Sequence, residues 1–297
     1  MDWQNQLIKI YLTICEFFSQ LSSKVFLKIS PNSNPLFTDE ETITIYIFGI
    51  LNGQKNVKSI FNFTKNFLSE WFPQLSSYEG FLFRLNSLST VFSELVNFLL
   101  KDNKFKNEFS SVENITLVDS LPIMLTKNSR AHKCKTANDI SDTGYCASKE
   151  TYYYGMKLHL IAVFRNKELP TPKLVKFTKA SIHDLPAINK ELITQKNTKI
   201  LADKAYIDKK TKHNLTLVGS EIHTPIKLSK FKKELTHDEK VYSKIVSSFR
   251  QSIEILFNWL IETSGIQIAS KVRSTKGLMV HVYGRFSACL FKYMFIF

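Results

Sequence analysis

The chain has 297 residues, of which 44% are hydrophobic and 13% aromatic, which suffices for a sizeable core and excludes a disordered or low-complexity protein. Its formal net charge is +14, and because residues 1–110 hold ten basic and ten acidic side chains, the whole excess lies in residues 111–297. A region this basic attracts polyanions such as DNA, although a solvated basic surface explains the charge equally well.

The first third of the chain is predicted to form a small all-helical domain over residues 1–110. Thr38–Glu41 and Ser76–Glu79 both have the Ser/Thr-x-x-Glu pattern of a helix capping box, and Gly53 can close the first helix. Residues 77–100 are predicted to form one buried helical face or two short helices. The apolar positions behind this prediction are Phe81, Phe83, Leu85, Leu88, Phe92, Leu95 and Leu99. DNA binding, dimerisation and simple packing remain open as roles for this domain.

Residues 111–297 are predicted to form an α/β domain. Strands are expected at residues 114–119, 152–164, 173–178, 199–203 and 221–225, and helices at 184–195, from 207, and at 241–261. The last helix has an apolar stripe of Val241, Ile245, Phe249, Ile253, Leu256, Phe257 and Leu260. This order of elements predicts a mixed five-stranded sheet with helices, as in a ribonuclease H-like domain. Between the first two strands, residues 126–151 are predicted to form a long, basic, irregular loop.

Three acidic residues lie where the pattern predicts burial, or next to it. Asp119 lies within an apolar strand, Asp203 follows another, and Glu254 adjoins the apolar stripe of the last helix. Three clustered carboxylates repel one another unless a cation lies between them. Two divalent ions, Mg²⁺ or Mn²⁺ as its substitute, would relieve the repulsion and create a site for phosphoryl transfer. Spacing alone does not single out this triad, because the chain has 26 acidic residues.

Six segments, taken in order, resemble motifs of the DDE transposases of bacterial insertion sequences, particularly the insertion-sequence family numbered nine-eight-two. They are Val118-Asp-Ser-Leu-Pro122, Tyr154-Gly-Met-Lys-Leu-His159, Ser181-Ile-His-Asp184, Leu201-Ala-Asp-Lys-Ala-Tyr206, Thr224-Pro-Ile-Lys227 and Arg250-Gln-Ser-Ile-Glu-Ile-Leu-Phe257. Residues 36–41 and 78–88 also look similar to the family, so the resemblance covers nearly the whole chain. The sequence departs from the family at Ala205, where glycine is usual and gives the backbone more freedom.

The resemblance implies a ribonuclease H-like catalytic domain over residues 111–297, with Asp119, Asp203 and Glu254 as catalytic residues and as ligands of two metal ions. It further implies cleavage of DNA at terminal inverted repeats, attack of the freed 3′-hydroxyls on target DNA, and a homodimer assembled on DNA. Three alternatives remain: a stand-alone metal-dependent nuclease, a catalytically inactive relic that only binds DNA, and a helical, basic nucleic-acid-binding protein without catalytic activity.

Several basic residues are candidate contacts to DNA, with a solvated surface as the alternative for each. They are Arg130, Lys133, Lys135, Lys157, His159, Lys204, Lys227, Arg250, Lys271 and Arg273. Arg250 lies one helical turn before Glu254, so it can orient that carboxylate, form a plain ion pair with it, or bind DNA. His183 and Asp184 are interpreted as the start of a helix, where they would serve as a cap.

Cysteines and apolar segments bear on the cellular location. Four cysteines occur without a Cys-x-x-Cys pair, which argues against a disulfide framework and fits a reducing compartment. His132, Cys134 and Cys146 share one polar segment but lack the fourth ligand of a structural zinc site. The first residues lack a signal-peptide pattern, and the apolar segment from residue 288 is interrupted by Lys292. We therefore expect a cytoplasmic protein, associated with the bacterial nucleoid and without a membrane partner.

Overall fold

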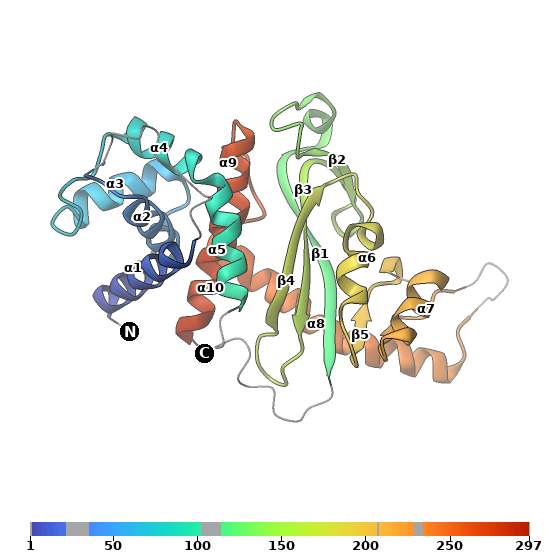
Figure 1. The fold of residues 1–297 in the computed structure, drawn as a ribbon. Helices are drawn as coiled ribbons and strands as arrows, with labels where there is room; N and C mark the ends of the chain where they lie inside the picture. Colours follow the sequence, from blue (N-terminus) through green and yellow to red (C-terminus); the bar gives the residue numbers. More distant parts are fainter. Residues whose placement is uncertain (1, 22–35, 102–113, 207, 229–233, 297) are drawn as a thin grey trace. The chain divides into compact units, whose positions relative to one another are not determined.

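The computed structural model describes residues 2–21, 36–101, 114–206, 208–228 and 234–296 (Figure 1). The chain forms two compact units, which are described separately. The first comprises Met1–Asp102 and Leu260–Phe297, and the second comprises Asn103–Trp259. Within the part of the chain that is described, no helix is long and apolar enough to cross a membrane.

Five helices from the first third of the chain contribute most of the first unit. They are α1 (Trp3–Gln20), α2 (Asp39–Leu51), α3 (Val57–Phe67), α4 (Tyr78–Ser87) and α5 (Ser89–Lys101). The predicted capping box at the start of α2 is confirmed, since the Glu41 N–H donates to Thr38 Oγ1 at 3.2 Å and the Thr38 N–H donates to Glu41 Oε2 at 2.6 Å. Gly53 follows the end of α2 with a φ of 77°, a left-handed conformation that favours glycine there.

Two details of the helical prediction are wrong. The cap of α4 is Ser77, one residue later than predicted, and its side chain accepts a hydrogen bond from the Gly80 N–H at 3.2 Å. Residues 77–100 form the two short helices α4 and α5, and six of the seven predicted apolar positions are buried. Phe83 is the exception at 61% exposed, because two residues along a helix turn a side chain to the face opposite Phe81 and Leu85.

The end of the chain also belongs to the helical unit. The last turn of α8 (His237–Ser264) is followed by α9 (Thr275–Met279), a π-helical turn and α10 (Arg285–Ile296). Buried Arg285 ties these pieces together, donating to His281 Nδ1 at 3.2 Å and to the carbonyl oxygens of Lys55 and Ser264. The boundary predicted at residue 110 remains a prediction, but residues 260–297 pack with the first helices.

Six strands form a mixed sheet in the second unit. They are β1 (Ile115–Lys127), β2 (Asp142–Cys146), β3 (Thr151–Val163), β4 (Thr171–Lys179), β5 (Lys199–Ala202) and β6 (Glu221–His223). The strand β3 pairs antiparallel with β1 along one edge and with β2 and β4 along the other. Beyond β1 the sheet continues with β5 and β6, which both run parallel to β1.

All five predicted strands are present, but the sheet has a sixth strand inside the predicted loop. The prediction of residues 126–151 as irregular is therefore wrong at β2. Gly144 and Cys146 are buried in that strand while Tyr145 is exposed, so the period-two pattern is present. It spans too few residues, with a glycine among them, to stand out in a polar segment.

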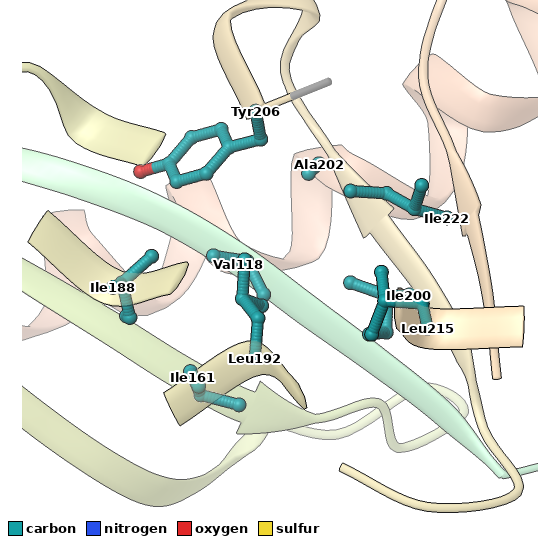
Figure 2. Close-up of a cluster of buried hydrophobic side chains, with 9 residues drawn as sticks. All are labelled: Val118, Ile161, Ile188, Leu192, Ile200, Ala202, Tyr206, Leu215 and Ile222. Atoms are coloured by element: carbon teal, nitrogen blue, oxygen red, sulfur yellow. The ribbon is translucent and has the colours of Figure 1, made fainter. Parts of the chain in front are cut away.

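Two helices cover one face of the sheet, and Arg250 near the middle of α8 contacts Asp119 on the other face. A cluster of buried side chains joins β1, β3, β5 and β6 to α6 (Asp184–Ile193) and α7 (Lys209–Leu217) (Figure 2). Its members are Val118, Ile161, Ile188, Leu192, Ile200, Ala202, Tyr206, Leu215 and Ile222. Since side chains alternate along a strand, Asp119 points away from the face that Val118 presents to this cluster. The predicted stripe on α8 is wrong at its start, where Val241 is 43% and Ile245 is 52% exposed.

Candidate active site

Two of the predicted acidic residues meet where β5 ends. Val118 on β1 and Ala202 on β5 are partners in the parallel pairing, and Asp119 and Asp203 are the residues that follow them. Parallel strands run in the same direction, so this register places both aspartates side by side at the C-terminal end of β5. Asp203 also begins the short 3-10 turn Lys204–Tyr206.

Arg250 on α8 joins these two carboxylates. Its Nη2 lies 3.2 Å from Asp119 Oδ2, and its Nη1 lies 3.5 Å from Asp203 Oδ1. The Arg250 and Asp119 side chains are only 13% and 19% exposed, whereas that of Asp203 is 48% exposed. The ion pairs that Arg250 forms in the structure are with these two aspartates, and its contact with DNA and its orientation of Glu254 stay predictions. Arg250 is the cation between two acids.

Burial raises the pKa of the Asp119 carboxyl to about 6. Loss of water outweighs the backbone N–H of Ser120, which donates to Asp119 Oδ1 at 2.8 Å, and the positive charge of Arg250, both of which lower the pKa. The nearby charge of Asp203 raises it further. A carboxylate that is this costly to ionise gains from any cation that reaches it.

Replacing Asp119 with asparagine should stabilise the protein at about pH 8, in chelator, by up to about 3 kcal/mol, the equivalent of a pKa raised from 3.8 to about 6. A raised folded-state pKa means that the stability contributed by the protonated carboxyl is fully present below pH 3.8 and is lost as the pH rises through about 6. Urea unfolding of wild type and Asp119→Asn should therefore agree near pH 4 and separate by about pH 7. A difference that does not change with pH would contradict this account of Asp119.

Glu254, the third predicted acid, does not form one cluster with the other two. It is exposed on α8, one turn beyond Arg250. Among the residues that the structure describes, no three Asp, Glu, His or Cys side chains come close enough to hold a metal ion together. The structure thus unites Asp119 with Asp203 and leaves Glu254 on a solvent-facing part of the helix that carries Arg250.

On the opposite face of β1, another acidic residue, Asp184, forms a hydrogen-bond network. Asp184 Oδ1 accepts hydrogen bonds from Ser120 Oγ and Lys157 Nζ, both at 3.1 Å, and Lys157 also donates to the carbonyl oxygen of Ile182 at 3.0 Å. Asp184 begins α6, but His183 at the capping position makes no side-chain capping bond. The predicted capping role is wrong, because the Asp184 carboxylate instead ties α6 to β1 and β3.

His159 completes this network from inside the protein. The side chain is fully buried on β3, with Nε2 2.8 Å from Thr178 Oγ1 and Nδ1 3.9 Å from Asp184 Oδ1. Burial lowers the pKa of His159 to about 4, against the opposing charge of Asp184, so the ring is neutral at neutral pH. His159 is buried and Lys157 is bound to Asp184, so in this structure neither side chain is free, and their contact with DNA stays a prediction.

The sequence alone does not indicate a role for Tyr206, yet its side chain lies close to the acids. Its side chain is 1% exposed, and its backbone N–H donates to the Asp203 carbonyl oxygen at 3.0 Å, which closes the 3-10 turn. Burial, and then the charges of Asp184, Asp119 and Asp203, raise the pKa of Tyr206 well above its usual value. The one sequence feature that could have indicated Tyr206 as part of the site is its position three residues after Asp203. Ala205 in the same turn does not have a positive φ, so glycine is not required there.

Comparison with known protein families adds to this geometry. A family described as "Transposase DDE domain" matches residues 109–274, which is more than half of the chain and includes all three predicted acids. The chain belongs to the transposase DDE domain family. Searches of curated proteins and of solved structures each gave no match. DDE transposase domains cleave and transfer DNA in transposition and use divalent metal ions, so DNA is the partner of this domain.

The aspartates of this DDE domain fit a divalent ion. Their oxygens already converge on one cationic group, the guanidinium of Arg250. Carboxylate oxygens are the ligands that hard divalent cations prefer, and the desolvated Asp119 carboxylate gains most from such a charge. Asp119 and Asp203 are therefore suited to hold a metal ion between β1 and β5.

The remaining predicted DNA contacts of the DDE domain are exposed side chains. Arg130 and Lys133 belong to the 3-10 helix Asn128–Lys133 that follows β1. The others are Lys135, Lys204, Lys227, Lys271 and Arg273. Phosphate groups can reach each of them, and their contact with DNA stays a prediction.

Proposed function

We propose that the protein is the transposase of a bacterial insertion sequence, which cuts DNA at the terminal inverted repeats of its element and joins the freed 3′-hydroxyls to target DNA. The observation that carries the proposal is the pair Asp119 and Asp203 in a DDE domain, held by one guanidinium directly after the paired residues Val118 and Ala202 of parallel strands. The ordered motifs similar to the family numbered nine-eight-two favour that family. We further propose a homodimer assembled on DNA at the bacterial nucleoid.

A ribonuclease H-like fold is part of this proposal. The sheet has the order β4-β3-β1-β5-β6, in which β3 is antiparallel to its neighbours and β5 and β6 are parallel to β1. Helices α6 and α7 pack on one face, and α8 brings Arg250 to Asp119 on β1. This arrangement supports the fold for the catalytic domain, with β2 added at the edge of β3.

The proposed metal ligands are Asp119, Asp203 and Glu254, holding two Mg²⁺ ions or Mn²⁺ in their place. Such ions, when bound, activate the attacking oxygen and stabilise the leaving oxygen of phosphoryl transfer. The protein contributes the placement of its acids: the β1–β5 register fixes Asp119 beside Asp203, and the single positive charge of Arg250 offsets part of their negative charge. Glu254 is carried on the same helix as Arg250, one turn away.

Cleavage of the flanking DNA tests the proposal. The DNA that brackets the gene should contain matched terminal repeats, and a linear fragment carrying them is the substrate. With Mg²⁺ or Mn²⁺ the protein should cut at the repeat ends, and chelator should stop the reaction. Cutting without preference for the repeats would indicate a stand-alone nuclease. DNA binding without any cutting would indicate an inactive relic.

DNA affinity should depend steeply on salt, because basic side chains release phosphate counterions when they bind. We expect at least about a tenfold loss of affinity between about 50 mM and about 200 mM salt. The variant Lys204→Gln with Lys227→Gln should reduce the slope of log affinity against log salt by about two, since each lost phosphate contact contributes about one. An unchanged slope in this variant, measured by fluorescence anisotropy, would remove both lysines from the interface.

A further inference from the structure

Two large aromatic side chains face solvent at the end of the sheet formed by β2 and β3. Tyr145 and Tyr152 are register partners across these strands, and each is about half exposed, at 50% and 52%. Their ring centroids are 5.1 Å apart, and the His132 ring lies 5.4 Å from Tyr152. The neighbouring side chains of Cys146 and Tyr153 are buried, so the two tyrosine rings form an accessible aromatic surface on an ordered support.

Cationic side chains lie beside these rings in sequence and in the fold. Arg130 and Lys133 share the 3-10 helix of His132, Lys135 follows it, and all three are exposed. Within the described part of the chain, none of the three lies within ion-pair distance of a carboxylate. The acidic residue at the start of β2, Asp142, is engaged elsewhere: hydrogen bonds from Ser181 and the Thr143 N–H, and the charge of Lys179, lower its pKa.

We propose that Tyr145, Tyr152 and His132 form a stacking platform for unpaired DNA bases, and that Arg130, Lys133 and Lys135 bind the phosphates of the same strand. Aromatic rings beside cations are the chemistry that single-stranded nucleic acid requires, because every base has a π-face and every nucleotide a charge. Paired bases are stacked on one another within a duplex and do not offer these faces. The platform rests on the proposed function only for the identity of the nucleic acid as DNA.

The platform is separate from the site of cleavage. Asp119 and Lys127 are eight residues apart on β1, which is about 26 Å in an extended strand. The 3-10 helix with His132 begins directly after Lys127, at the end of β1 remote from β5 (Figure 1). Bases bound there are therefore not those attached to the phosphate that is cut, and the two sites can be tested independently.

Binding in chelator tests the platform without any need for catalysis or for the repeat sequence. The probes are a fluorescent single-stranded oligonucleotide of mixed sequence and the blunt duplex made from it. The full-length double variant Tyr145→Ala, Tyr152→Ala should lose about 10-fold to 100-fold in affinity for the single strand, since stacking contributes that much per base. Its affinity for the duplex should change by less than about threefold. The matched variant Tyr145→Phe, Tyr152→Phe keeps the rings and should bind the single strand like wild type.

Two further variants guard against a purely structural role. Phe83→Ala removes a ring that is 61% exposed on α4 and should leave binding of both probes unchanged. Tyr145→Leu, Tyr152→Leu keeps apolar bulk on the strands and should reproduce the loss seen with alanine, at an unchanged melting temperature. Single-strand affinity equal to wild type in the alanine or leucine variants, or an equal loss for both probes, would overturn the platform. Failure of the protein to cut repeat DNA would overturn the proposed function and leave this result unaffected.

Discussion

Asp119→Asn and Asp203→Asn should each lower metal-dependent cleavage of terminal-repeat DNA by about a thousandfold or more, while DNA affinity changes little. Each substitution keeps the shape of the side chain but removes a charged ligand, and several kcal/mol of transition-state stabilisation depend on the metal. The rate of cleavage at saturating DNA measures the effect, and anisotropy in chelator measures binding. If either variant retains near wild-type cleavage, that aspartate is not a metal ligand.

Glu254 provides the most informative part of this test, because it is exposed and does not cluster with the aspartates in the structure. Glu254→Gln should lower cleavage as strongly as the aspartate variants. Glu262→Gln is a matched control, since Glu262 is also an exposed glutamate on α8, eight residues further along. If Glu254→Gln cuts DNA as well as wild type and Glu262→Gln, the metal site uses Asp119 and Asp203 without Glu254.

Arg250→Gln should lower the melting temperature in chelator by about 4–8 °C, corresponding to about 2 kcal/mol. It leaves the Asp119 carboxylate buried beside Asp203 with no cation to offset either charge. Arg250→Lys keeps the charge but not the two-pronged geometry, so it should fall between wild type and Arg250→Gln. Adding Asp119→Asn to Arg250→Gln should restore most of the loss, because the uncompensated buried charge is gone.

Divalent metal ions should also offset the negative charges of Asp119 and Asp203. A divalent ion that binds the native state raises its melting temperature by mass action. The increase should be larger in Arg250→Gln than in wild type, because the variant has no guanidinium to displace from the aspartates. Identical melting of Arg250→Gln and wild type in chelator would show that Arg250 does not stabilise the pair of acids.

The pair of aspartates could be predicted from the sequence because the motifs that resemble DDE transposases select them from 26 acidic residues, and local signals are consistent with both. Asp119 interrupts an apolar strand and Asp203 follows another, but the parallel pairing that brings the two side by side is seen only in the structure. The partner of Arg250 could not be predicted in this way. The spacing along the helix predicts Glu254 as the partner of Arg250. The contact in the structure instead joins Arg250 to Asp119, 131 residues away in the sequence.

Tertiary packing also decided the details that the sequence prediction missed. The alternation of Lys157 and His159 correctly placed both on one strand face, but α6 covers that face, so Asp184 binds Lys157 and His159 is buried. Aspartate is a common capping residue at the start of a helix. The Asp184 carboxylate instead accepts hydrogen bonds from Ser120 on β1 and Lys157 on β3. The exposure of Phe83, by contrast, could have been predicted, because its position two residues from Phe81 and Leu85 places it on the opposite face of α4.

The most direct test of the central claim is the joining of a pre-cut element end to a target. A short duplex ending in the terminal repeat with a free 3′-hydroxyl is incubated with supercoiled plasmid and Mg²⁺ or Mn²⁺. Wild-type protein should covalently join the duplex to the plasmid, and Asp119→Asn and Asp203→Asn should give no joined product. Cleavage of repeat DNA by wild type without any joining, or joining that persists in both aspartate variants, would contradict the account.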